Sequence, residues 1–276
     1  MNIQTITKSL INAGIEPSEA KYEIKMLLEH FFNYTAEDSA RGKELTPEQL
    51  DILQEKVALR IKDRTPIQYI IGEAWFMGKF FKVTPDVLIP RDETEILVRQ
   101  AIDLIRERKL KNVLDIGTGS GCIACTIAMN TDATVLGVDI SSDALRVALD
   151  NVTKLRINNR AVFRKSDVFE KVREDEKFDI IVSNPPYIPF GTELDKEVQH
   201  EPKIALFAEE NGLQIYRKII EKAPEYLTAG GYLMFEVGIN EAAQVKSFME
   251  EDFCEIIVTK DLSGIDRTVI GRLKVQ

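Results

Sequence analysis

The stretch Val113-Leu114-Asp115-Ile116-Gly117-Thr118-Gly119-Ser120-Gly121 decides the fold. It begins as an apolar, strand-like run and continues into a glycine-rich turn, after which Ile123 to Ala128 reads as a helix. Glycines let the backbone approach a ligand closely, and open α/β sheets bind ligands at the carboxyl ends of their strands. The turn does not end in Gly-Lys-Ser/Thr, which excludes the phosphate-binding loop of nucleotide hydrolases. The stretch therefore predicts an α/β domain and indicates, only loosely, a nucleoside ligand.

Strand-like and helix-like segments alternate after this stretch. Alternation of this kind predicts a mostly parallel sheet with helices on both faces. No internal repeat or low-complexity tract interrupts it. We expect the strands at residues 113–116, 134–138, 161–163, 178–182, 232–237, 254–258 and 268–273.

The first third of the chain has a different pattern. Pro17 stands at a helix start, and Thr46-Pro47-Glu48-Gln49 resembles a capping box with proline at the first helical position. Aromatic and β-branched residues surround Gly78, which suggests a β-hairpin. Asp92-Glu93-Thr94-Glu95 offers a D-x-x-E cap for a further helix. The domains we expect are a helical domain at 1–73, a hairpin linker at 74–90 and an α/β domain at 91–276.

Composition narrows the classes of partner. The formal net charge of the 276 residues is -9, which opposes binding to a phosphate backbone and favours a basic protein partner, so we expect no stable nucleic-acid binding. No signal-like amino terminus and no run of about 18 apolar residues occurs, so we expect no membrane association. Three cysteines give no disulfide framework, which favours the cytoplasm. Two histidines and no cluster with zinc spacing indicate no metal.

Two aspartates follow later strands of the series. Asp139 ends the second strand, where an acidic side chain can accept hydrogen bonds from both hydroxyls of a ribose. Its alternative role is a helix cap before Ser141. Asp167, in Ser166-Asp167-Val168, follows the third strand and could face an adenine ring, with a plain surface loop as the alternative.

The segment Asn184-Pro185-Pro186-Tyr187 carries the chemistry. It ends a hydrophobic strand, and its consecutive prolines lock φ and remove backbone donors, which makes the loop a rigid acceptor. An amide nitrogen is hard to methylate because its lone pair is delocalised into the carbonyl. The Asn184 side-chain oxygen and the Pro185 carbonyl can each accept one N–H of an amide NH2 and so hold its nitrogen toward a methyl donor. Tyr187 would give an aromatic wall.

These motifs together resemble the protein-(glutamine-N5) methyltransferases of the HemK/PrmC type over nearly the whole chain. Further matching stretches are residues 64–72, 87–91 with Glu93-Thr94-Glu95, and His200-Glu201-Pro202 with Ala205-Leu206. The family modifies the glutamine of the Gly-Gly-Gln motif in peptide chain release factors. Asp92 stands where the family usually has proline, and residues 208–213 also depart from its pattern. Contacts of Arg91, Glu93 and His200 with cofactor or substrate therefore stay open.

The resemblance implies a Rossmann-like class I S-adenosylmethionine-dependent methyltransferase domain with a seven-stranded sheet whose last strands form an antiparallel pair. It also implies that the helical domain helps to engage the substrate, a class 1 peptide chain release factor. The residues expected to bind S-adenosylmethionine are Gly117, Thr118, Gly119, Ser120, Gly121, Asp139, Asp167, Val168 and Asn184. The residues expected to bind the substrate amide are Asn184, Pro185, Pro186 and Tyr187, with Asn184, Pro185 and Tyr187 as the catalytic set.

Other readings stay open at this point. Asn-Pro-Pro-Tyr also occurs in adenine-N6 methyltransferases, although the basic face and target-recognition segment expected of a nucleic-acid enzyme are not visible. A glutamine of a large-subunit ribosomal protein is another acceptor for this loop. A binding module without turnover is disfavoured by the intact glycine turn, Asp139 and Asn184. Cys122-Ile123-Ala124-Cys125 has redox spacing, but its place on a helix against the sheet predicts core packing.

Overall fold

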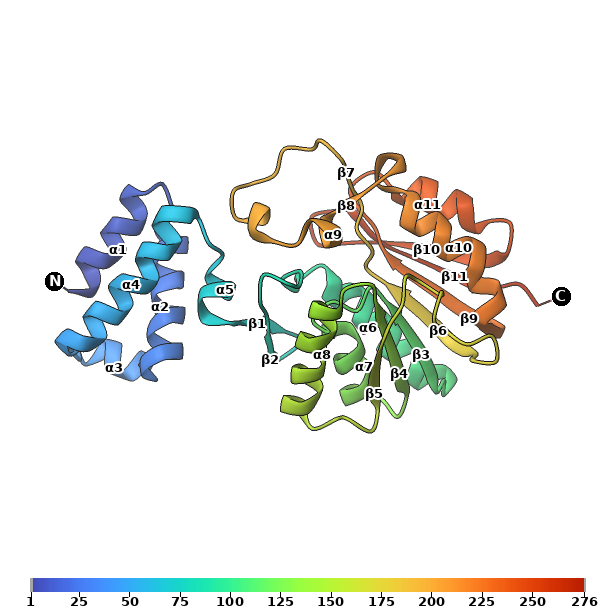
Figure 1. Ribbon diagram of the computed structural model, residues 1–276, viewed down its shortest axis with the longest axis horizontal. Coiled ribbons are helices and arrows are strands. Elements are labelled where there is room, and N and C mark those ends of the chain that lie inside the picture. The colour runs from blue at the N-terminus through green and yellow to red at the C-terminus, as the bar shows by residue number, and fades with distance from the viewer. Residues whose placement is uncertain (1, 276) are drawn as a thin grey trace. The chain divides into compact units, whose positions relative to one another are not determined.

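The computed structural model describes residues 2–275, which group into two compact units (Figure 1). The first unit runs to Glu73 and also includes Leu194–His200. The second comprises Ala74–Glu193 and the chain from Glu201 onward. The segment 194–200 lies inside the range 91–276 that we expected for the α/β domain, but it packs with the first unit. The first unit is therefore made of two separate stretches of sequence.

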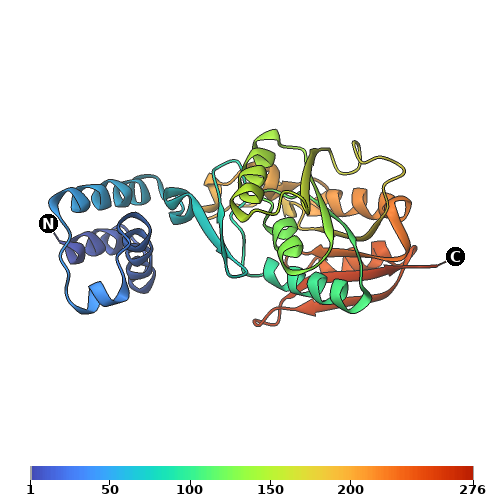
Figure 2. The ribbon, with the colours of Figure 1, turned by 90° about the horizontal axis from the view of Figure 1, so that it is seen from below.

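The first unit is helical, and its three longer helices pack against one another (Figures 1 and 2). Pro17 is the first residue of its helix, as the sequence predicts. The capping box at Thr46 is confirmed, because the Thr46 hydroxyl accepts from the Gln49 amide at 3.3 Å and the Gln49 side chain accepts from the Thr46 amide at 3.0 Å. The helices are α1 (Ile3–Asn12), α2 (Pro17–Phe32), α3 (Ala36–Ala40), α4 (Pro47–Asp63) and α5 (Ile67–Ile71).

A buried arginine joins the segment 194–200 to these helices. Arg60, on α4, is 2% exposed and forms ion pairs with Glu23 of α2 and with Glu197, each at 2.8 Å. Arg64 binds the same Glu197 carboxylate at 2.8 Å. Burial raises the pKa of Glu23 despite the neighbouring guanidinium. A buried charge needs such partners, since an unpaired one costs several kcal/mol, on the order of 3 to 5 when a partner is removed.

The expected hairpin is present at the start of the second unit. Strands β1 (Glu73–Phe76) and β2 (Lys79–Lys82) pair across the Met77-Gly78 turn, and both turn residues have positive φ, 48° and 79°. Two residues with positive φ match the twist of antiparallel strands, and glycine adopts this conformation without steric cost.

The second unit contains the predicted seven-stranded sheet, in the order β10-β11-β9-β6-β3-β4-β5. Neighbours from β9 to β5 are parallel, whereas β11 is antiparallel to both β9 and β10. The antiparallel pair expected from the family resemblance is thus confirmed. The strands are β3 (Asn112–Ile116), β4 (Thr134–Asp139), β5 (Ala161–Lys165), β6 (Phe178–Ser183), β9 (Leu227–Glu236), β10 (Phe253–Lys260) and β11 (Asp266–Leu273).

Helices cover both faces of this sheet (Figure 1). Successive strand residues point to opposite faces, so Leu114 and Ile116 enter one core while Val113 enters the other. The first core is completed by α10 (Gln214–Tyr226) and α11 (Ala242–Met249), and the second by α6 (Thr94–Arg108), α7 (Cys122–Asn130) and α8 (Ser142–Leu155). Short elements connect them, namely β7 (Ile188–Pro189), α9 (Lys203–Leu206), β8 (Phe207–Ala208) and the 3-10 turns Val198–His200 and Glu210–Gly212.

The expected cap at Asp92 is wrong. Helix α6 begins at Thr94 after Glu93, which makes no side-chain cap hydrogen bond. The Glu95 carboxylate instead accepts from the Met77 amide at 2.7 Å and so holds the hairpin turn. The Thr94 hydroxyl donates to Glu236 on β9 at 2.6 Å. Glu95, which the local pattern assigned to a helix cap, therefore forms a long-range hydrogen bond instead.

Candidate active site

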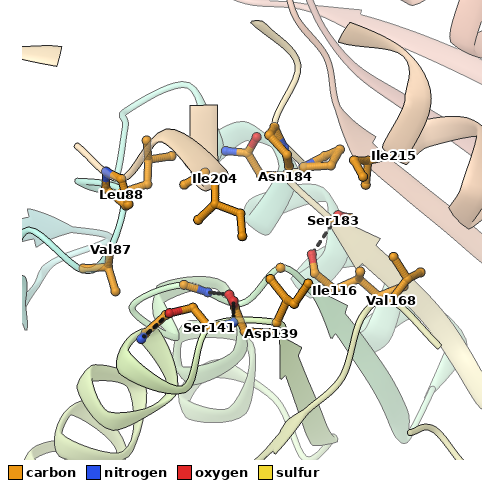
Figure 3. A pocket seen from close by; sticks show the side chains of 18 of the residues that line it. Val87, Leu88, Ile116, Asp139, Ser141, Val168, Ser183, Asn184, Ile204 and Ile215 are labelled. Atoms are coloured by element: carbon orange, nitrogen blue, oxygen red, sulfur yellow. Dashed lines mark hydrogen bonds between the residues drawn. The ribbon is translucent and has the colours of Figure 1, made fainter. Parts of the chain in front are cut away.

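A cavity opens at the carboxyl ends of β3, β4, β5 and β6, the edge where open α/β sheets bind ligands. Its volume is about 890 Å³ when the solvent space at its mouth is included. Figure 3 shows Asp139 and Ser141 on one side of it and Asn184 on the other. The predicted site residues that line it are Gly117, Gly119, Asp139, Asp167, Val168, Asn184, Pro185 and Pro186.

The glycine turn is shaped by backbone conformation and by close packing. Gly117, Gly119 and Gly121 have φ values of 73°, 54° and 76°, which side chains rarely adopt. A methyl group on Gly121 would lie 3.0 Å from the Phe163 ring and 3.1 Å from the Ala148 side chain. The first two glycines face the cavity, whereas Gly121 lets the turn pack onto β5 and α8.

Thr118 and Ser120 lie behind the cavity wall and are 3% and 2% exposed. The Thr118 hydroxyl donates to Asp115 at 2.6 Å. The Ser120 carbonyl accepts from the side chain of Asn151, a fully buried residue of α8 that also bonds the Lys82 backbone in both directions. In this structure, the Thr118 side chain and the Ser120 carbonyl hold the turn in place, while the expected contact of both residues with the cofactor stays a prediction.

Asp139 is held with its carboxylate at the cavity. Oδ2 accepts from the Gly119 amide at 2.9 Å, and Oδ1 accepts from the Ser141 amide at 2.8 Å. Burial raises the pKa of this carboxyl group, and the backbone hydrogen bonds oppose that shift. The cap of α8 is Ser141, whose hydroxyl accepts from the Ala144 amide at 3.1 Å. Each carboxylate oxygen keeps a further lone pair, as ribose binding requires.

Asp115, one strand away, is fully buried behind the turn. Its Oδ2 accepts from Thr118 and, at 3.2 Å, from the Ala124 amide, while Oδ1 has no hydrogen-bond partner among the described residues. Burial raises the pKa of Asp115 to about 7. Asp115 itself does not line the cavity, but it directly precedes Ile116, which does, and when ionised it would favour a positively charged ligand there.

The loop after β5 forms another side of the cavity. Val168 has φ 49°, and the Ser166 hydroxyl donates to its carbonyl at 2.8 Å. The Asp167 carboxylate binds Lys218 of α10 at 2.7 Å. Asp167 and Val168 therefore line the predicted site, but one oxygen of the Asp167 carboxylate is paired with the Lys218 ammonium group.

The Asn184 loop starts beside the glycine turn because β6 pairs with β3, with Ser183 opposite Ile116. The Ser183 hydroxyl donates to the Ile116 carbonyl at 2.7 Å. A methyl group on Gly117 would lie 4.0 Å from the Asn184 backbone oxygen. The carbonyl of Pro185 accepts no backbone hydrogen bond within residues 2–275. The two loops thus share one cavity.

The Asn184 side chain is oriented by residues far away in the sequence. Its Nδ2 donates to the Thr94 hydroxyl at 3.2 Å, and Thr94 donates to Glu236 at 2.6 Å. Thr94 and Glu236 are 3% and 2% exposed. Within the described chain, no donor bonds to the Asn184 Oδ1 atom, which remains available to a ligand.

Tyr187 differs in position from the three residues before it. The cavity lining includes Asn184, Pro185 and Pro186, but the Tyr187 ring packs on Gly238, where a methyl group would lie 2.9 Å from Cδ2. Burial raises the pKa of the Tyr187 phenol. Its expected role as a wall for the substrate stays a prediction.

Sequence reasoning missed one wall of the cavity. Val87 and Leu88 lie on one side of it in Figure 3 together with Ile204. The segments that carry them are joined by Glu201, which is 4% exposed, accepts from the Ile89 amide at 3.0 Å and pairs with Arg91. The signal was present in the matching stretches 87–91 and 200–202 with 205–206, but their contact depends on the tertiary fold.

The cysteines behave as packing residues. Cys122 and Cys125 are buried in the core on α7, as predicted, and burial raises the pKa of the Cys122 thiol to about 12. A thiol with such a pKa stays protonated and unreactive near neutral pH.

Comparisons with solved structures agree on the fold. A ribosomal protein L11 methylase from Lactobacillus delbrueckii matches with TM-score 0.53 and 20% identity, covering 71% of this chain and 86% of that one. A Thermus thermophilus 16S rRNA N2 G1207 methyltransferase in complex with AdoMet and guanosine matches with TM-score 0.55 and 20% identity, covering 73% and 50%. The Rossmann-like class I methyltransferase fold expected from the sequence is confirmed.

Comparisons of sequence identify the family. Residues 107–266 match the family described as a methyltransferase domain, and residues 3–72 match the PrmC N-terminal domain. The release factor glutamine methyltransferase of Geobacter sulfurreducens is 44% identical over 84% of this chain and 81% of that protein. That of Neisseria gonorrhoeae is 37% identical over 91% and 93%. The chain belongs to the release factor glutamine methyltransferase family.

Proposed function

We propose that the protein transfers the methyl group of S-adenosylmethionine to the side-chain amide nitrogen, N5, of the glutamine in the Gly-Gly-Gln motif of class 1 peptide chain release factors. The observation that carries this proposal is the Asn184 loop, in which a side-chain oxygen and the Pro185 carbonyl are both available beside the glycine turn. The names of relatives that are 37% to 44% identical point to the same substrate.

The cavity fits the cofactor. Asp139 presents a carboxylate with lone pairs to spare for the ribose hydroxyls, and apolar side chains from three segments, including Val87, Val168 and Ile204, line the remainder. S-adenosylmethionine, when bound, supplies a methyl group on a positively charged sulfur. The nearby Asp139 and Asp115 carboxyls lower the electrostatic cost of holding that charge in a partly closed site.

The residues of the chain act by positioning. Asn184 Oδ1 and the Pro185 carbonyl accept the two N–H groups of the substrate amide and hold its nitrogen in one orientation. They also favour the positive charge that develops on this nitrogen as it gains a methyl group, because both are acceptors aimed at its hydrogens. The chain therefore needs no general base to remove a proton beforehand, because the nitrogen becomes cationic as it gains the methyl group and then loses one N–H proton to solvent.

The amino-terminal unit is assigned to recognition of the release factor. Residues 3–72, which match the PrmC N-terminal domain, supply the helices of this unit. The net charge of -9 favours a basic protein partner over nucleic acid, so stable nucleic-acid binding does not form part of the proposal. None of the described helices is both long and apolar enough to cross a bilayer. Three cysteines without a disulfide fit the cytoplasm as the working compartment.

The test is methyl transfer from labelled S-adenosylmethionine to an unmodified release factor. A release factor with Gln→Asn in its Gly-Gly-Gln loop, a large-subunit ribosomal protein and a double-stranded oligonucleotide serve as parallel acceptors. Label on the release factor alone, lost with Gln→Asn, is expected. Label on the ribosomal protein or on the oligonucleotide instead would replace the proposed substrate.

A further inference from the structure

The chain of hydrogen bonds behind Asn184 has a feature that the proposed chemistry does not yet use. An asparagine amide carries an acceptor oxygen on one side and a donor NH2 on the other, and a rotation of half a turn exchanges them. Only the orientation with Oδ1 toward the substrate can accept an N–H of the glutamine. A device that fixes this orientation therefore contributes directly to turnover.

Thr94 can fix the orientation of the Asn184 amide because a hydroxyl has a single hydrogen. Its hydrogen is directed to the Glu236 carboxylate at 2.6 Å, so the oxygen of Thr94 can only accept at its other contact. That contact is the Asn184 side chain at 3.2 Å. The donor face of Asn184 must then point to Thr94, which leaves Oδ1 for the ligand.

We propose that Thr94 and Glu236 are positioning residues that hold Asn184 with its oxygen toward the substrate amide. The proposal rests on the proposed function, since it assumes an acceptor with an N–H to donate. Neither residue lines the cavity, and each acts through the next one. The three residues come from the start of α6, the end of β9 and the loop after β6, so they converge only in the folded sheet.

The ionisation state of Glu236 determines which group donates in each hydrogen bond between Glu236, Thr94 and Asn184. Burial raises its pKa to about 7, with Thr94, Arg267 and Arg91 opposing the shift and Glu93 adding to it. The ionised carboxylate can only accept, whereas a protonated carboxyl could donate to Thr94 and free the Thr94 hydrogen for Asn184 Oδ1. Turnover should then fall as the pH decreases through about 7. The other ionisable groups near Glu236 are Tyr187, Cys122 and Tyr216.

The first experiment compares Thr94→Val with Thr94→Ser. Valine matches the shape of threonine but has no acceptor, and serine keeps the hydroxyl. We expect kcat for release factor methylation to fall about tenfold in Thr94→Val and to stay within about twofold in Thr94→Ser. The dissociation constant for S-adenosylmethionine should not change in either. Equal kcat in both variants, or a parallel loss of cofactor affinity in Thr94→Val, would overturn the proposal.

The second experiment uses Glu236→Gln and a pH profile. A glutamine side chain does not titrate, and it offers Thr94 a donor NH2 as well as an acceptor oxygen at every pH. The wild type should lose kcat between pH 8 and pH 6, and Glu236→Gln should be flat there; an unchanged profile would assign the titration elsewhere and reject the role of Glu236. Cofactor binding measured on each variant shows that it is folded. An inactive wild type would reject the proposed substrate alone, whereas an active wild type with equal Thr94 variants rejects the positioning role alone.

Discussion

Two loops meet at one edge of the sheet, and they are built in opposite ways. The glycine turn after β3 is held by neighbours in the sequence and on adjacent strands, with Asp139 bonded to Gly119 and Ser141. The Asn184 loop after β6 is held by Thr94 and Glu236, from elements far away in the chain. The first loop offers backbone groups and a carboxylate, and the second offers one oriented amide.

This difference separates two tasks. In the proposed function, cofactor binding depends on the first loop, where several contacts each contribute a part of the affinity, so the loss of one contact should lower affinity by a limited factor. In the proposed function, orientation of the substrate nitrogen depends on the Pro185 carbonyl and on Asn184, which Thr94 and Glu236 hold in place. Substitutions in the two loops should therefore change different kinetic constants.

The largest effect is expected for Asn184→Ala. The variant loses the side-chain acceptor for the substrate amide, so kcat should fall by about 100- to 1,000-fold, as for the loss of other preorganised groups in active sites. The dissociation constant for S-adenosylmethionine, measured by calorimetry, should stay close to that of the wild type. Asn158→Ala, in an exposed position, is the control. An equal loss of cofactor affinity would abolish the division between the loops.

An intermediate effect is expected for Asp139→Ala. Cofactor affinity should fall by about 10- to 100-fold because hydrogen bonds to a charged group are lost, whereas kcat at saturating cofactor should change far less. Ser141→Ala is the matched control, since it removes the cap of α8 but leaves the carboxylate. If Ser141→Ala weakened binding as much as Asp139→Ala, loosening of the loop would explain the loss and the carboxylate would have no direct role.

Gly121→Ala should change folding rather than a kinetic constant, and its effect is measured as the free energy of unfolding in urea. Both Gly121 and Gly264 have positive φ, so alanine at either costs about 1 to 2 kcal/mol in backbone strain. Only at Gly121 would the new methyl group also crowd Phe163 and Ala148, while Gly264 has open space around it. Gly121→Ala should therefore be less stable than Gly264→Ala by about 1 to 3 kcal/mol. Equal values would show that the turn is not packed as tightly as its contacts indicate.

The contrast between the loops also explains what the sequence could predict. The glycine turn, Asp139 and the seven strands follow from local composition and period, and the strand bounds agree to within a few residues. The exception is β9, which begins at Leu227 rather than near Tyr232, because Gly230 and Gly231 lack the side chains that mark a strand. The prediction of a cap at Asp92 was wrong because Glu95 and Thr94 form hydrogen bonds with residues that are distant in the sequence.

The rest of the site could not be predicted from local patterns. Thr94 and Glu236 are separated by 142 positions, and Arg91 and Glu201 by 110, so their contacts exist only once the sheet has formed. Neither pair has a spacing that a helix or a hairpin would produce. Buried side-chain hydrogen bonds of this kind could not be predicted, because neither residue of a pair belongs to a local sequence motif that indicates its partner.

The helical unit is not a detachable piece of the chain. Its Arg60 and Arg64 both bind Glu197, which arrives from a segment more than a hundred residues later. A fragment that stopped at Glu73 would keep the helices but lose this carboxylate, leaving the buried Arg60 with fewer anionic partners. A chimera that takes this unit from a relative would therefore have to take residues 194–200 from the same relative.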